Sequence, residues 1–124
     1  MAARPKLKSI RWVASTKEDL SACPDSVKDT IGYALYLVEC GQTPENAKPL
    51  KGFGGASVLE IVADFDGTTW RAVYTVEIAG VVYVLDFFQK KSTKGISTPK
   101  RIIDRIKERR KIVIEQERQK QKRN

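Results

Sequence analysis

Polar and apolar side chains alternate with a period of two residues in residues 8–13 and 70–78, which predicts a strand in each stretch. Residues 57–63 are mostly apolar and are also expected to form a strand. Residues 81–88 are almost wholly apolar, which is typical of a central strand buried on both faces. Asp66-Gly67 and Ala79-Gly80 lie between the last three predicted strands and indicate tight turns. These three strands therefore form an antiparallel meander.

Helical periodicity is clearest in residues 25–40, where Val27, Ile31, Leu35 and Val38 are spaced by three or four positions. This spacing predicts an amphipathic helix. Ser15 and Glu18 have the spacing of a capping box, so a short helix is expected just before it.

A third helix is expected from about residue 99 to at least residue 114, because Thr98-Pro99 fits an N-cap followed by proline in the first turn. Its apolar face contains Ile102, Ile103 and Ile106. Arg109 and Arg110 interrupt the apolar stripe, so we expect the helix to leave the core there. The polar residues after 117 are expected to fray.

These elements predict one small α+β domain, with a mainly antiparallel sheet and helices against one face, two of them N-terminal and one C-terminal. A chain of 124 residues is the length of a single domain. We assign residues 1–114 to the domain and residues 115–124 to a basic C-terminal tail. Residues 43–56 are expected to be a loop, because they are rich in Pro, Gly and Lys.

The net charge of +8 is confined to the last third of the chain. Residues 1–88 contain 9 basic and 11 acidic residues, whereas residues 89–124 contain 14 basic and 4 acidic ones. A basic excess of this size favours a polyanion such as nucleic acid as the partner. An anion-binding surface is therefore expected to include residues after Phe88.

The absence of His excludes His-based metal sites, Ser-His and Cys-His triads and the imidazole pair used by many ribonucleases. Cys23 and Cys40 are too few for a structural zinc site. A disulfide between them stays open, but the N-terminus has no signal peptide, which favours buried, inert thiols in a cytoplasmic protein. No apolar run approaches the roughly 18 residues of a membrane span. We expect neither a metal nor a cofactor.

Basic and phenolic groups stand near the ends of the predicted strands, where neighbouring strands bring side chains together. They are Lys48, Lys51, Arg71, Tyr74, Lys90 and Lys91. Arg71 alternates with Trp70 and Tyr74, so it faces the open side of the sheet if helices cover the face of Trp70 and Tyr74. Tyr74 then reaches a site only from an edge or a bend.

The same segments resemble the phage-derived, HigB-like branch of the RelE/HigB toxin superfamily. The resemblance spans residues 48–107, about half of the chain, in matching order and spacing. It is carried by Lys48-Pro-Leu-Lys-Gly, Leu59-Glu-Ile, Trp70-Arg-Ala-Val-Tyr-Thr, Val84-Leu-Asp-Phe-Phe-Gln-Lys-Lys-Ser and Thr98-Pro. The chain departs from the pattern at Val62, where the superfamily often has Arg, and in its long basic C-terminus.

The resemblance implies a RelE-like fold and the toxin of a type II toxin–antitoxin system. Such a toxin is a ribosome-associated endoribonuclease that cleaves mRNA without a metal, inhibits translation and is neutralised by a cognate antitoxin, here expected to be of the helix-turn-helix type. The residues that the resemblance and the pattern assign to catalysis are Lys51, Arg71, Lys90 and Lys91. Those assigned to RNA binding are Lys48, Tyr74, Phe88 and Lys94.

RNA cleavage through the 2′-hydroxyl needs a group that accepts its proton, cations that stabilise the phosphorane, and a proton donor for the 5′-oxygen. Without His, the base is a Lys, a Tyr or a carboxylate. Neighbouring cations lower the pKa of a Lys, because like charges disfavour its protonated form. Arg71 and Lys91 are expected to face the phosphate, and Lys51 or Lys90 to handle protons.

Other interpretations of the same residues stay open. Arg71 pairs with Glu60 or Glu77 across the sheet if its role is structural. The whole protein is alternatively a non-catalytic binding protein of the RelE/ParE type, either a gyrase poison or an inactive module that binds an antitoxin or RNA.

Overall fold

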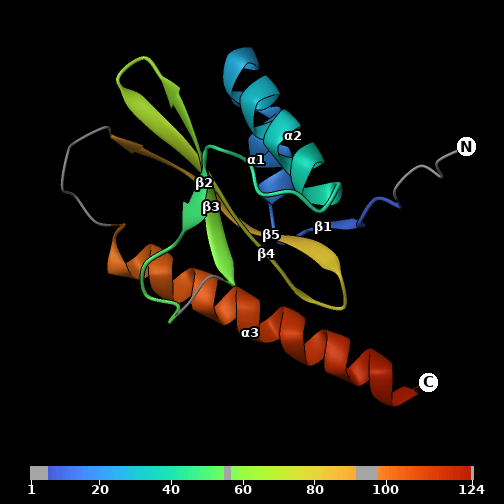
Figure 1. The fold of residues 1–124 in the computed structure, drawn as a ribbon. Coiled ribbons are helices and arrows are strands. Elements are labelled where there is room, and N and C mark those ends of the chain that lie inside the picture. Colours follow the sequence, from blue (N-terminus) through green and yellow to red (C-terminus); the bar gives the residue numbers. More distant parts are fainter. Residues whose placement is uncertain (1–5, 55–56, 92–97, 124) are drawn as a thin grey trace, which may run out of the picture.

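The computed structural model describes residues 6–54, 57–91 and 98–123, which form the arrangement of helices and strands drawn in Figure 1. The elements, in chain order, are β1 (Ile10–Trp12), α1 (Thr16–Ser21), α2 (Asp25–Glu39), β2 (Ala47–Pro49), β3 (Val58–Phe65), β4 (Thr68–Ile78), β5 (Val81–Lys91) and α3 (Lys100–Arg123). The predicted strands and helices are all present. β2 is an addition, because the sequence indicated only a loop there.

The five strands form one mixed sheet in the order β1-β5-β4-β3-β2. β3, β4 and β5 are the predicted antiparallel meander. β1 pairs with β5 in parallel, and β2 pairs with β3 in antiparallel orientation. The sheet is therefore mainly antiparallel, with one parallel pair at the β1 edge.

Both predicted hairpin turns are confirmed. Asp66 and Gly67 have φ values of 49° and 78°, and Ala79 and Gly80 have φ values of 51° and 69°. Two successive residues with positive φ give the turn twist that matches the twist of the flanking strands. These two turns place β3, β4 and β5 side by side.

The two faces of the sheet have separate hydrophobic cores. On one face, α2 packs Val27, Ile31, Leu35 and Val38 against sheet residues that include Ile61, Ala72, Tyr74 and Phe87. On the other face, α3 packs Ile102, Ile106 and Val113 against sheet residues that include Val58, Val73, Leu85 and Phe88. The expectation that all helices cover one face is thus corrected, because α3 crosses the face opposite α1 and α2 (Figure 1).

α3 stays in contact with the sheet beyond Arg109 and Arg110, contrary to the sequence expectation. Arg105 binds both oxygens of the buried Asp86 at 2.7 and 2.8 Å. Arg109 donates to the Leu85 carbonyl at 2.9 Å, and Arg110 binds both carboxylate oxygens of Glu77. These arginines therefore hold the helix to the sheet instead of ending its packing.

The C-terminal part of α3 is also helical, as residues 115–123 continue the helix without a break. Glu117 accepts a hydrogen bond from the Tyr83 hydroxyl at 3.2 Å, which ties this part to β5. The two cysteines are free thiols. Among the helices of the described residues, none is both long enough and apolar enough to cross a bilayer.

Candidate functional site

A row of charged side chains runs diagonally over four neighbouring strands, with Lys48 on β2, Glu60 on β3, Arg71 on β4 and Lys90 on β5. Lys48 lies opposite Glu60. Glu60 lies opposite Val73, two residues from Arg71, and Arg71 lies opposite Phe88, two residues from Lys90. Directly opposed residues and residues two apart share a face of a sheet, and long side chains reach diagonal neighbours. We call these four residues the cationic row.

Alternation along β4 decides which face holds the cationic row. Ala72 and Tyr74 are buried in the core under α2, so Arg71 and Val73 face the other side. Val73 packs under α3, whereas Arg71 lies nearer the end of the β4–β5 pair that is formed by Thr68 and Lys91. Arg71 is thus on the side expected from the sequence, with 13% of its side chain exposed.

Arg71 is held at two points of its guanidinium group. Its Nη1 donates to Glu60 Oε1 at 2.8 Å, and its Nε donates to Thr69 Oγ1 at 3.1 Å. The Thr69 hydroxyl in turn donates to the Lys90 carbonyl at 3.1 Å. A guanidinium has five N–H groups, and the described residues supply acceptors for two of them here. The described residues supply no acceptor for the other three, which are of the kind that bind phosphate oxygens.

Glu60 is the single acidic member of the cationic row, and only 5% of its side chain is exposed. Its Oε1 binds Arg71 and lies 3.8 Å from the Lys48 Nζ, while Lys48 itself is 61% exposed. Its Oε2 is buried and has no hydrogen-bond partner among the described residues. The predicted cross-sheet pair between Arg71 and Glu60 therefore exists.

The surroundings of Lys90 lower its pKa, as a proton-transfer role requires. Burial lowers the pKa of Lys90 below its usual value, and the positive charge of Arg71 lowers the pKa further. Glu60 opposes this shift and Lys48 adds to it. A larger fraction of Lys90 is therefore neutral near physiological pH than of an ordinary surface lysine.

The other predicted lysines are placed differently. Lys51 is exposed in the turn between β2 and β3 and is outside the cationic row. Lys91 follows Lys90 on β5 and lies opposite Thr68, so its side chain faces the other side of the sheet. Lys94 lies outside the described residues.

The two aromatic candidates are in the cores and not at the site. Tyr74 is 2% exposed in the core under α2, and burial raises the pKa of its hydroxyl above the usual value. Phe88 is 8% exposed and packs in the core under α3. The structure thus leaves almost no surface of Tyr74 for catalysis and little of Phe88 for stacking on a base.

Thr69 was not identified from the sequence, although it binds both Arg71 and the backbone of Lys90. Its signal was present in the alternation, since Thr69 and Arg71 are two residues apart on one strand. A threonine is common in strands for reasons of propensity, so the residue type alone carried no functional information.

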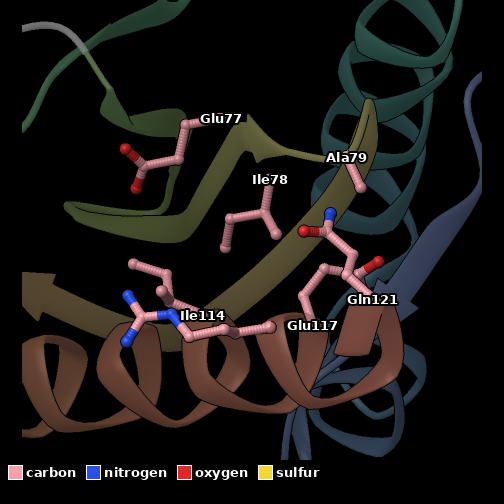
Figure 2. Close-up of a pocket in the computed structure, with 7 residues that line it drawn as sticks. Glu77, Ile78, Ala79, Ile114, Glu117 and Gln121 are labelled. Carbon is pink, nitrogen blue, oxygen red and sulfur yellow. The ribbon is translucent and has the colours of Figure 1, made fainter. Parts of the chain in front are cut away.

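A pocket of about 300 Å³ lies at the other end of the β4–β5 pair, between the turn at Ala79 and the last turns of α3 (Figure 2). It is lined by Glu77, Ile78, Ala79, Ile114, Glu117, Arg118 and Gln121. Glu77 and Glu117 are already bound to Arg110 and Tyr83. Within the described residues, no three Asp, Glu or Cys side chains gather as the ligands of a metal ion would.

The fold and the site define a small α+β protein with a cationic row on the part of a mixed sheet next to the start of α3. Residues 18–111, about three quarters of the chain, match the model of the family described as Phage derived protein Gp49-like (DUF891). The chain therefore belongs to this family, which consists of RelE-like toxins of toxin–antitoxin systems. The match includes the whole cationic row. No curated protein and no solved structure matches the chain.

Membership of this family also indicates a partner for the protein. A toxin of such a system has an antitoxin as its partner.

Proposed function

We propose that this protein is a HigB-like toxin with a RelE-like fold, which cleaves mRNA on the ribosome, inhibits translation and is neutralised by a cognate antitoxin of the helix-turn-helix type. The observation that carries the proposal is the pair of Arg71 and Lys90 on one face of adjacent strands, with the pKa of Lys90 lowered by burial and by Arg71. The family match supports the toxin part of the proposal.

The proposed chemistry is transesterification by the 2′-hydroxyl of the RNA. Neutral Lys90 accepts the proton of this hydroxyl, whose oxygen attacks the adjacent phosphorus. The bond from phosphorus to the 5′-oxygen breaks, which leaves a 2′,3′-cyclic phosphate and a 5′-hydroxyl. The reaction consumes no metal and no further reactant.

Arg71 stabilises the negative charge of the phosphorane through its free N–H groups, because it cannot act usefully as a base. The departing 5′-oxygen needs a proton, and protonated Lys48 or Lys51 is the donor in this scheme. Both side chains are exposed. Lys48 belongs to the cationic row, and Lys51 follows it closely in the sequence.

The decisive experiment is inducible expression followed by primer extension on a reporter mRNA. Cleaved mRNA with cuts at a fixed position of the reading frame supports a ribosome-associated nuclease. Arg71→Ala is the matched inactive variant, and its expression should leave the reporter intact.

The same experiment discriminates the alternative, a non-catalytic RelE/ParE-like binding protein. Growth arrest with intact mRNA, DNA breaks and an SOS response identifies a gyrase poison. Absence of growth arrest identifies a module that only binds an antitoxin or RNA.

A further inference from the structure

Glu60 is a buried acid placed among three cations, on the strand next to Arg71. It lies in the diagonal row between Lys48 and Arg71, with Lys90 beyond Arg71. A carboxylate with 5% exposure is strongly disfavoured unless cations and hydrogen-bond donors compensate for its lost hydration. The three cations of the row supply that compensation. In turn, the negative charge of Glu60 offsets the repulsion between these cations.

The contact of Glu60 with Arg71 differs from the pairs that Arg105 and Arg110 form on this face of the sheet. Arg105 and Arg110 each bind both oxygens of one carboxylate, Asp86 and Glu77, in a two-point contact. Arg71 instead uses Nη1 on Glu60 and Nε on Thr69. This contact fixes the orientation of the guanidinium plane, and the described residues supply no acceptor for Nη2 or for the second Nη1 hydrogen.

We propose that Glu60 is a positioning residue of the site: its carboxylate fixes the Arg71 guanidinium and supplies the negative charge that keeps Lys48, Arg71 and Lys90 together on adjacent strands. The role of Glu60 in RNA cleavage rests on the proposed function. Its effect on Arg71 and Lys90 is a property of the protein without RNA. In the complex, the RNA phosphate takes the free N–H groups of Arg71, while Glu60 continues to hold the opposite side.

The protonation of Lys90 reports this role, because three neighbouring strands place charged groups around it. Arg71 on β4 and Lys48 on β2 are positive and lower the pKa of Lys90, as does burial. Glu60 on β3 is the negative group that raises it. Neutralising Glu60 therefore removes the attraction and leaves the repulsion, so Lys90 loses its proton at lower pH.

The test is an NMR titration of the Lys90 side chain in the full-length protein, without RNA, with Lys90→Arg used to assign the signal. Glu60→Gln should move the titration midpoint of Lys90 to lower pH. The control is Glu77→Gln, which also neutralises a carboxylate that is paired with an arginine on this sheet, but at the other end of β4. Equal midpoints in these two variants overturn the proposal.

A second comparison keeps the proposal testable if Glu60→Gln does not fold. Arg71→Gln removes a neighbouring cation and should raise the midpoint of Lys90, and the double variant Glu60→Gln with Arg71→Gln contains no unpaired buried ion. The midpoint should be lower in the double variant than in Arg71→Gln. An unchanged midpoint between these two variants overturns the proposal.

Cleavage gives an independent readout. The pH profile of kcat/KM should shift to lower pH in Glu60→Gln, in step with the NMR midpoint, whereas a purely structural loss lowers the rate equally at every pH. If the parent protein cleaves no RNA while Glu60→Gln still shifts the Lys90 midpoint relative to the parent, the proposed function is overturned and the role of Glu60 is supported.

Discussion

Arg71 and Glu60 meet side by side across β3 and β4, with Nη1 and Oε1 2.8 Å apart and the carboxylate almost completely buried. The hydroxyl of Thr69 holds the same guanidinium at Nε. An arginine fixed at two points from within the protein loses little conformational freedom when it binds a phosphate. Arg71 is therefore held by two hydrogen bonds, whereas Lys48 approaches Glu60 only to 3.8 Å.

Replacement of Arg71 should affect cleavage more than binding. We expect Arg71→Ala to lower the single-turnover cleavage rate by about 10²- to 10³-fold, as is typical when one donor to a transition-state oxyanion is removed. Arg71→Lys should restore only part of the rate, because an ammonium lacks the planar fork. The measurement is single-turnover cleavage of reporter mRNA on ribosomes. A parental rate in Arg71→Ala would remove Arg71 from the reaction.

Lys90 and Lys91 form a matched pair of neighbours on opposite faces of the sheet. Lys90→Ala should lower the cleavage rate by about 10²- to 10⁴-fold, the usual range for loss of a general acid or base. Lys91→Ala should change it by only a few-fold, through general attraction of RNA. The same single-turnover assay compares the two. A larger loss in Lys91→Ala than in Lys90→Ala would contradict the face assignment.

Asp86 is 1% exposed and receives Arg105 and Arg109 from α3. Asp86→Asn should lower the free energy of unfolding by about 3 kcal/mol, because it leaves the positive charges of this partly buried network uncompensated. Asp104→Asn is the control, since its pair with Lys100 is exposed and should contribute less than about 1 kcal/mol. Urea unfolding measures both. Equal losses would show that Asp86 does not anchor α3.

Glu77 should make the stability depend on pH. Its hydrogen bonds from Arg110 lower the pKa of Glu77 from its ordinary value of 4.5. The unfolded chain therefore binds the proton first as the pH falls, so the stabilisation is complete above about pH 5 and is lost in more acidic solution. Thermal unfolding between about pH 7 and pH 3 should show a smaller acid loss in Arg110→Gln than in the parent. Parallel curves would contradict this pairing.

The periodicity of the sequence was sufficient for most elements but not for β2 or for the length of α3. β2 has three residues and includes Pro49, so it has no alternation of its own, and it is a strand because β3 offers a free edge. Arg109 and Arg110 interrupt an apolar stripe in the sequence. In the structure their partners are Asp86, the Leu85 carbonyl and Glu77, which lie more than twenty residues away along the chain.

The sequence predicted only part of the candidate site, because the burial of a side chain also depends on contacts between residues distant in the sequence. The alternation in β4 placed Arg71 correctly, and the resemblance indicated Lys48 and Lys90. Tyr74 and Phe88 were selected by residue type, but each is under a helix, α2 or α3. The alternation along β5 already implies that Lys90 and Lys91 cannot share a face.

The sequence by itself determined most of the elements, the turns at Asp66-Gly67 and Ala79-Gly80, and the concentration of positive charge after Phe88, because these depend on local backbone preference and on composition. The tertiary structure decided which of those charges remain available. The sheet supplies hydrogen-bond acceptors for three arginines of α3, Arg105, Arg109 and Arg110. The cations near Glu60 are instead Lys48, Arg71 and Lys90. Strand register and helix docking set these partners, and both depend on contacts between residues distant in the sequence.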